Sequence, residues 1–157
     1  MRVVVWSVAV IAAAPLPVPI GVGPRYRPPP ALHGPCRVAP LHAGRRAHLE
    51  LFANRRVVIV PARLGVRGRC RAHAWTTEPT GVVRFDRAET LGDLFAVWGQ
   101  PLGAGRLLSF RGRVSLYRNG VRVHGDVRQV SLRDRDELVV EIGGYIPPHR
   151  SFVFPPH

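Results

Sequence analysis

Cys70 and His73 form a Cys-x-x-His pair, and these residue types suit a transition metal. A thiolate and a neutral imidazole bind zinc or copper, and a structural site needs about four such ligands. His48 and His42, which precede the pair in the chain, could supply the others. The predicted metal ligands are therefore His48, Cys70 and His73. Because the chain has 7 histidines, the competing interpretation is that these are unrelated surface side chains.

The two cysteines, Cys36 and Cys70, also suit a disulfide, because an even number of cysteines in an exported chain favours pairing. Closing a loop of that length stabilises a fold by roughly 3 to 4 kcal/mol in the chain-entropy model. The bond would tie a proline-rich segment to an arginine-rich loop. In a reducing compartment both thiols would stay free, so the metal and the disulfide are open alternatives for Cys70.

The usual catalytic motifs are absent from the sequence: it has no Gly-x-Ser-x-Gly, no His-Glu-x-x-His, no Walker loop and no dinucleotide fingerprint. His48 and Glu50 match the first half of a zinc-deaminase motif, but no Pro-Cys-x-x-Cys follows. Asp134, Asp136 and Glu137, just before an apolar segment, are typical of a solvated turn. We therefore expect no catalytic residues and a protein that is not an enzyme.

The formal net charge is +13, and all 23 basic residues are arginine. Four of them surround the Gly65–Gly68 loop and lie near Trp75, a combination that can bind anions. An exported protein seldom meets nucleic acid, so the expected partner is an anionic envelope polymer or a lipid headgroup. The competing interpretation is a solvated, arginine-rich loop. The predicted anion-binding residues are Arg63, Arg67, Arg69 and Arg71.

An apolar run from Val3 to Ala14 follows Met1 and Arg2, with the length of the hydrophobic region of a secretory signal. Residues 1–22 are predicted to be a signal peptide or an N-terminal membrane anchor. Residues 23–46 are predicted to be a Pro/Gly/Arg-rich linker, and residues 47–157 a single domain with a proline-rich tail. The chain is therefore expected to be exported, either secreted or held at the outer face of the membrane.

One segment, Thr90 to Leu102, has the pattern of an amphipathic helix. Leu91, Leu94, Phe95 and Trp98 recur at helical spacing. Thr90 is placed to cap the first turn with Asp93, and Gly99 and Pro101 end the pattern. Phe95 and Trp98 are predicted to be core residues.

Short strands are predicted on both sides of this helix. Asn119-Gly120 is the strongest hairpin signal in the chain, and residues 62–79 are expected to be a surface loop. The tail either adds an edge strand or wraps the domain, because its prolines forbid a central strand. The predicted fold class is α+β, a small β-grasp-like mixed sheet of short strands and hairpins with one helix packed across it. The predicted strands are 48–52, 57–60, 81–86, 107–110, 114–117, 121–124 and 138–142.

The segments TLGDLFAVWGQPL, LYRNGVRVHGDVR and ELVVEIGG, with the later PPH, resemble a family of small exported bacterial proteins of uncharacterised function. The resemblance covers roughly residues 47–156. It implies alternating histidines that end in Ala-His-Leu before the first strand. It also implies histidines in a Leu-His-Thr-His-Asp segment and in the Gly-Val-Ile-His strand that follows it. Imidazoles converging from neighbouring strands suit a transition metal.

The chain departs from that pattern at most of the implied ligands. Arginine cannot replace histidine as a ligand, because its guanidinium is never deprotonated in proteins. The implied site is therefore lost here, or rebuilt with Cys70 and His73. Only His48 is kept, and the other positions hold Gly44, Arg46, Trp75, Thr77 and Arg84, with Glu78 at the position of the acid.

Two functions follow as expectations. The first is a non-catalytic, exported binding or interaction module without a cofactor. The alternative is an exported protein that binds one zinc or copper ion at a degenerate His/Cys site. The scattered histidines and carboxylates give an enzyme the least support.

Overall fold

The computed structural model describes residues 33–156, and it shows an α+β fold of mixed sheets with one α-helix. The predicted signal or anchor, residues 1–22, lies outside the described residues. The main sheet contains, in spatial order, β12 (Val121–Val123), β11 (Val114–Arg118), β13 (Glu137–Ile142), β2 (Arg45–Ala53), β7 (Val82–Phe85) and β6 (Ala74–Thr76), and β3 (Arg56–Val58) also pairs with β2.

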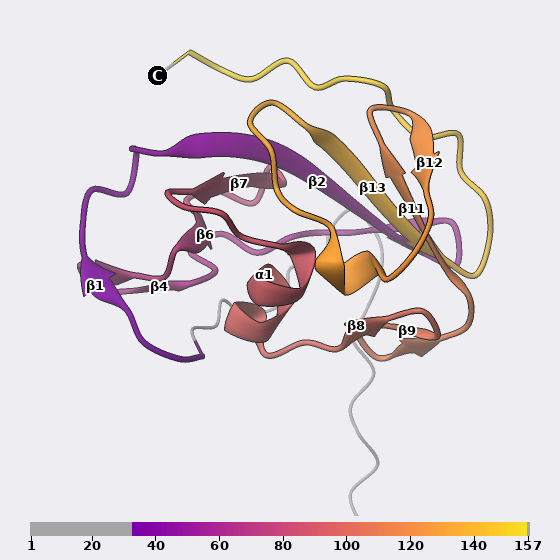
Figure 1. The fold of residues 1–157 in the computed structure, drawn as a ribbon, viewed down its shortest axis with the longest axis horizontal. Coiled ribbons are helices and arrows are strands. Elements are labelled where there is room, and N and C mark those ends of the chain that lie inside the picture. Colours follow the sequence, from indigo (N-terminus) through magenta and orange to yellow (C-terminus); the bar gives the residue numbers. More distant parts are fainter. Residues whose placement is uncertain (1–32, 157) are drawn as a thin grey trace, which may run out of the picture.

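The centre of the main sheet is a parallel pair, β2 and β13, and every other pair in it is antiparallel. His48 lies opposite Glu137, and Ala53 lies opposite Ile142. Parallel strands need a long crossover connection. Here that connection contains the α-helix and most of the shorter strands (Figure 1). The last strand of the chain, β13, therefore lies at the centre of the sheet, between β11 and β2.

The helix α1 (Leu91–Trp98) forms where the sequence predicts it. The Thr90 hydroxyl accepts a hydrogen bond from the backbone N–H of Asp93, and the Asp93 carboxylate accepts one from the Thr90 backbone, so the capping box is complete. Gly99 adopts a left-handed conformation, with φ of 69°, and ends the helix.

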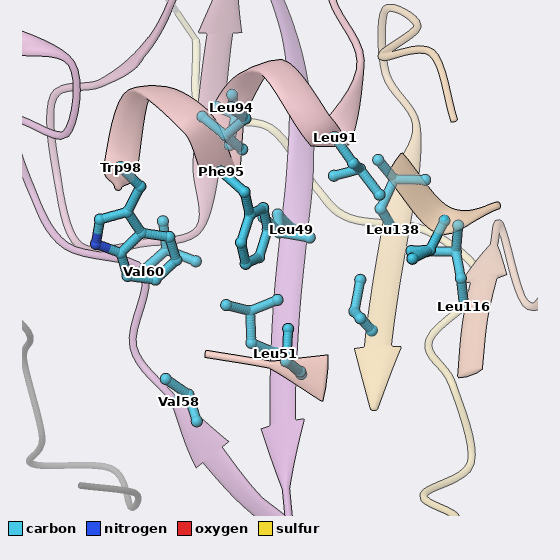
Figure 2. Close-up of a cluster of buried hydrophobic side chains, with 14 of the residues drawn as sticks. Leu49, Leu51, Val58, Val60, Leu91, Leu94, Phe95, Trp98, Leu116 and Leu138 are labelled. Atoms are coloured by element: carbon cyan, nitrogen blue, oxygen red, sulfur yellow. The ribbon is translucent and has the colours of Figure 1, made fainter. Parts of the chain in front are cut away.

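The helix packs across one face of the main sheet and builds the core with it (Figure 2). Phe95 and Trp98 are buried, as predicted, and their rings are 5.4 Å apart. Figure 2 shows Leu94 and Phe95 above Leu49 of β2, while Leu91 points toward Leu138. The inward positions of the two central strands are Ala47, Leu49, Leu51 and Ala53 on β2 and Leu138, Val140 and Ile142 on β13.

The two predicted hairpins are confirmed, and their turns explain them. Asn54 and Arg55, between β2 and β3, have φ angles of 51° and 63°. Asn119 and Gly120, between β11 and β12, have φ angles of 52° and 80°. Two consecutive positive φ angles are typical of the tight turns whose twist matches a hairpin.

Two regions are more ordered than predicted. The expected linker, residues 23–46, contributes β1 (Arg37–Val38) and the start of β2. The prediction of a surface loop over residues 62–79 is wrong, because this segment contains three short strands. Trp75 on one of them is fully buried. These strands are β4 (Val66–Arg67), β5 (Cys70–Arg71) and β6, and β1, β5 and β4 form a small sheet.

A second small sheet follows the helix. It lies where one strand was predicted over residues 107–110, and a 3-10 helix, η1 (Val127–Gln129), follows the second hairpin. Among the described residues, no helix is long and apolar enough to cross a membrane. The strands of this sheet are β8 (Leu102–Gly103), β9 (Arg106–Leu107) and β10 (Phe110–Arg111).

The disulfide between Cys36 and Cys70 is present, as predicted, with the two Cα atoms 5.5 Å apart. It joins the N-terminal segment to β5, beside the pairing of Val38 with Cys70. The C-terminal tail, residues 145–156, forms no strand and runs over the main sheet on the side away from α1 (Figure 1). Of the two alternatives for the tail, the structure shows the wrap.

Candidate functional site

The side chains of β2 alternate between the core and the opposite face of the main sheet, which we call the tail face. Arg46, His48, Glu50 and Phe52 lie on the tail face, because the intervening residues belong to the core. Glu137 and Glu141 of β13 and Arg84 of β7 share this face by register and alternation. The tail face is therefore a polar surface carried by the three central strands.

The C-terminal tail is held to the tail face by side chains of β2. Nη1 of Arg46 donates a hydrogen bond of 2.7 Å to the carbonyl of Pro155, and its guanidinium lies 5.4 Å from the centre of the Phe154 ring. The rings of His48 and Phe152 stack with centres 3.7 Å apart. The tail thus covers charged groups that would otherwise face solvent.

Arg46 and Arg84 are direct partners on β2 and β7. Like charges directly opposite each other on one face of a sheet are destabilising. Arg46 is only 6% exposed, so solvent screens the pair poorly. The packing of the sheet alone therefore does not explain why both positions hold arginine.

The surroundings of Arg84 leave its charge incompletely balanced. Nη1 donates to the carbonyl of His42 at 2.8 Å, but Nε is buried without a hydrogen-bond partner among residues 33–156. Burial lowers the pKa of Arg84, and the neighbouring charge of Arg46 lowers it further, against an opposing effect of Glu78. An anion placed at the guanidinium would offset the two effects that lower the pKa.

A cavity of about 250 Å³ lies beside these two arginines. Pockets for drug-sized ligands measure roughly 300 to 1,000 Å³, so this one suits a small charged group. Thr77 and Thr80 add hydroxyl groups, and Glu78 adds one negative charge. The lining residues are His42, Arg46, Thr77, Glu78, Thr80, Val82, Arg84, Pro155 and Pro156.

A second polar cluster occupies the next positions of the tail face. His48 and Glu137, both buried, approach to 2.8 Å between Nδ1 and Oε2. His149 of the tail lies 2.9 Å from both carboxylate oxygens of Glu50. The Glu50 carboxylate raises the pKa of His149 through this contact.

The predicted metal ligands have separate partners. The sulfur of Cys70 is in the disulfide, so it offers no thiolate. Nδ1 of His73 lies 2.8 Å from Asp86, whereas His48 contacts Glu137. A site built from His48, Cys70 and His73 stays a prediction that these contacts do not favour.

The predicted anion-binding arginines also differ among themselves. Arg71 is buried, its guanidinium stacks 3.6 Å from the centre of the Trp75 ring, and it forms an ion pair with Asp86. Its charge is therefore used within the protein. Arg63, Arg67 and Arg69 are exposed near the β4–β5 hairpin, where they fit the interpretation of a solvated loop.

Sequence reasoning missed Arg46 and Arg84 as a pair, and it assigned Glu137 to a solvated turn. Glu137 is in fact the first residue of β13 and 1% exposed. The alternation Arg46, His48, Glu50 on a strand was the available signal for the tail face. The pairing of β2 with β7 and β13 was needed to bring the other residues to it.

Of the positions where the family resemblance implies histidines, three are neighbours across adjacent strands. Arg84 is the partner of both Arg46 and Trp75 across adjacent strands. Arginine and tryptophan supply no metal ligand, so the residues present do not fit a metal there. No protein-family model, curated protein or solved structure matches the chain. The resemblance therefore stays a prediction.

Proposed function

We propose that this protein is a non-catalytic, exported binding module that holds a phosphate-class oxyanion between Arg46 and Arg84. The single observation that carries the proposal is the cross-strand arginine pair with the unpartnered, buried Nε of Arg84 within the described part of the chain. A guanidinium can bind phosphate by two parallel hydrogen bonds, and Nε with one terminal nitrogen is one such pair of donors.

The chemistry of the cavity favours an oxyanion over other ligands. Two guanidinium groups supply positive charge, and Thr77 and Thr80 can donate hydrogen bonds from their hydroxyls. Glu78 is the one carboxylate in the lining, and its single negative charge can neutralise only one of the two arginine charges. The cavity therefore carries a positive excess that an anion of an envelope polymer or a lipid headgroup would balance.

The proposal of export rests on the signal-like N-terminal sequence and on the disulfide. Structural disulfides persist mainly in oxidising compartments. In such a compartment the phosphate groups of lipids and envelope polymers are the oxyanions that a basic protein meets first. No catalytic role is proposed for the cavity residues.

We also propose that the fold is a variant of the β-grasp. The proposal is supported by the central parallel pair of β2 and β13, by the antiparallel partner of each, β3 on β2 and β11 on β13, and by α1 lying across the sheet. The further antiparallel strands β7 and β6 extend the sheet beyond β2. β7 carries Val82 and Arg84 of the anion cavity, and the connection between β6 and β7 carries Thr77, Glu78 and Thr80.

The proposal is tested by thermal unfolding of the full chain in the presence of inorganic phosphate. Phosphate at tenfold its dissociation constant should raise the melting temperature by about 4 °C. The Arg84→Gln variant should lose this shift. Arg111→Gln, which removes one charge from an exposed arginine on β10, is the charge-matched control and should keep it. Equal shifts in both variants would mean that phosphate acts only through net charge.

A further inference from the structure

The second cluster of the tail face has the composition of a metal site. His48, Glu50 and Glu137 each offer one ligand atom, and these atoms lie within 4.8 Å of one another. His48 and Glu50 alternate on β2, and Glu137 is the register partner of His48 on β13. The two central strands therefore bring three potential ligands together, and none of the three comes from a loop.

The hydrogen bonds of His48 fix which of its nitrogens is available. Nε2 lies 2.8 Å from the carbonyl of Thr80, which can only accept, so Nε2 carries the proton of this bond. On a neutral ring Nδ1 then has a lone pair, and it faces Oε2 of Glu137 at 2.8 Å. Two acceptors at this distance need a cation between them, either a proton or a metal ion. A histidine that donates one nitrogen to a backbone carbonyl and offers the other is the usual arrangement of a metal ligand.

A second observation at the same place concerns the other oxygen of Glu137. The side chain is 1% exposed, and Oε1 has no hydrogen-bond partner within residues 33–156. A buried carboxylate oxygen without a partner is costly, because its desolvation is not repaid. A bound cation would satisfy it.

The tail adds a second histidine beside Glu50, outside the three-residue group whose ligand atoms lie within 4.8 Å of one another. Nδ1 of His149 is 2.9 Å from both oxygens of Glu50, and Phe152 stacks on the His48 ring from the same tail. The Phe152 ring limits access of water to the cluster. A cavity of about 130 Å³ is lined in part by His48 and Glu50.

The backbone beside His48 is shaped to admit the ring. Gly81 has a φ angle of 79°, and a Cβ at this position would lie 2.9 Å from Nε2 of His48 and 2.6 Å from the carbonyl of Leu49. Only glycine fits here without displacing the imidazole. The backbone at Gly81 therefore leaves the space that the imidazole of His48 occupies.

We propose that His48, Glu50, Glu137 and His149 bind one divalent transition-metal ion, with zinc the first to test. Two imidazoles and two carboxylates suit zinc, and the two negative charges balance the ion. Ligand atoms on one zinc ion lie roughly 3 to 4 Å apart. The 2.8 Å contact between His48 and Glu137 would therefore open slightly, the wider separations of up to 4.8 Å in the three-residue group would contract, and His149 would move in with the tail. The inference is independent of the anion cavity.

The test is a titration of the full chain, freed of metal with a chelator, by isothermal calorimetry with zinc chloride. A parallel titration with cobalt(II) reports four-coordinate binding by its visible absorption. We expect one ion per chain. Glu50→Gln and His149→Gln replace side chains that are not fully buried, and each should weaken zinc binding at least about tenfold.

Two matched variants complete the experiment. His124→Gln removes an exposed histidine away from the cluster, and His73→Gln removes the histidine that contacts Asp86. Both should bind zinc as the unchanged protein does. Absence of saturable binding would overturn the inference, and so would a loss of affinity that is equal in all four variants or confined to His73→Gln. Thermal unfolding of each variant without metal shows that it is folded. Glu137 is not replaced, because it is 1% exposed and its loss would also change the core of the sheet.

Discussion

Arg84 of β7 lies directly opposite Arg46 of β2, and both side chains leave the sheet on the face that the helix does not cover. The cavity beside them and the unpartnered Nε of Arg84, among the described residues, make this pair the basis of the proposed anion site. When no ligand is present, repulsion between the two guanidinium groups should lower the free energy of unfolding. The proposal can therefore also be tested by unfolding the protein without a ligand.

In a buffer without polyvalent anions, Arg84→Gln should be as stable as the unchanged protein or more stable by up to about 1 kcal/mol. The reason is that it removes one of two like charges facing each other. Urea unfolding measures this free energy. Arg111→Gln, on an exposed residue, should change it by no more than a few tenths of a kcal/mol. A loss of more than 1 kcal/mol in Arg84→Gln would show that the guanidinium stabilises the fold and is not held there for a ligand.

Thr90→Ala should destabilise the protein by about 1 kcal/mol, because the hydroxyl that caps α1 is removed. Thr90→Ser keeps the hydroxyl and should restore most of the loss. Chemical denaturation of the two variants and the unchanged chain gives the comparison. If serine and alanine are equally destabilising, the capping bond is not the cause.

Reduction of the disulfide should lower the free energy of unfolding by about 4 kcal/mol, because Cys36 and Cys70 are 34 residues apart and the bond restricts the unfolded chain. Urea unfolding with and without a reductant measures the difference. The double variant Cys36→Ser with Cys70→Ser should match the reduced protein and should not respond to reductant. A reduced protein as stable as the oxidised one would contradict the role assigned to this bond.

Asp86 should make the protein sensitive to acid between about pH 4 and pH 2. Burial favours its neutral form, but hydrogen bonds from His73 and Arg71 and the nearby charges of Arg71 and Arg37 outweigh this and lower its pKa to about 2. Because the pKa is lower in the folded state than in the unfolded one, its contribution is present above the unfolded value of about 3.9 and is lost as the pH falls through the folded value.

With an allowance for solvent screening, this contribution is on the order of 1 to 2 kcal/mol. Stability curves of the unchanged chain and of Asp86→Asn, measured at successive pH values, should approach each other below about pH 4 and converge below about pH 2. A constant difference between the two curves across this interval would show that the charge of Asp86 is not what stabilises the fold.

The elements with local signals were predictable from the sequence. The helix followed from its apolar period and from the capping pair Thr90 and Asp93, and the second hairpin from Asn119-Gly120. The strands at residues 66–76 were not predictable, because they are two or three residues long and depend on pairing with distant segments. Trp75 is fully buried, and its indole N–H donates to the carbonyl of Leu41 in the N-terminal segment, 34 residues earlier in the chain.

The candidate sites were less predictable than the fold. His48 was singled out without Glu137, because which side chains meet it depends on the parallel register of β2 with β13. From the sequence Glu137 appeared in a charged turn, whereas in the structure it is the first residue of β13 and is buried. The role of the tail, which brings His149 and Phe152 to the same face, has no local sequence signal at all.

Anomalous diffraction from a crystal of the full chain grown with selenate would locate a phosphate-class oxyanion without a mutation. The proposed function predicts a selenium peak within hydrogen-bond distance of Arg46 and of Nε of Arg84, in the cavity that Thr77 and Thr80 line. A cavity without selenium, with the Glu78 carboxylate turned onto Arg84 in its place, would contradict it.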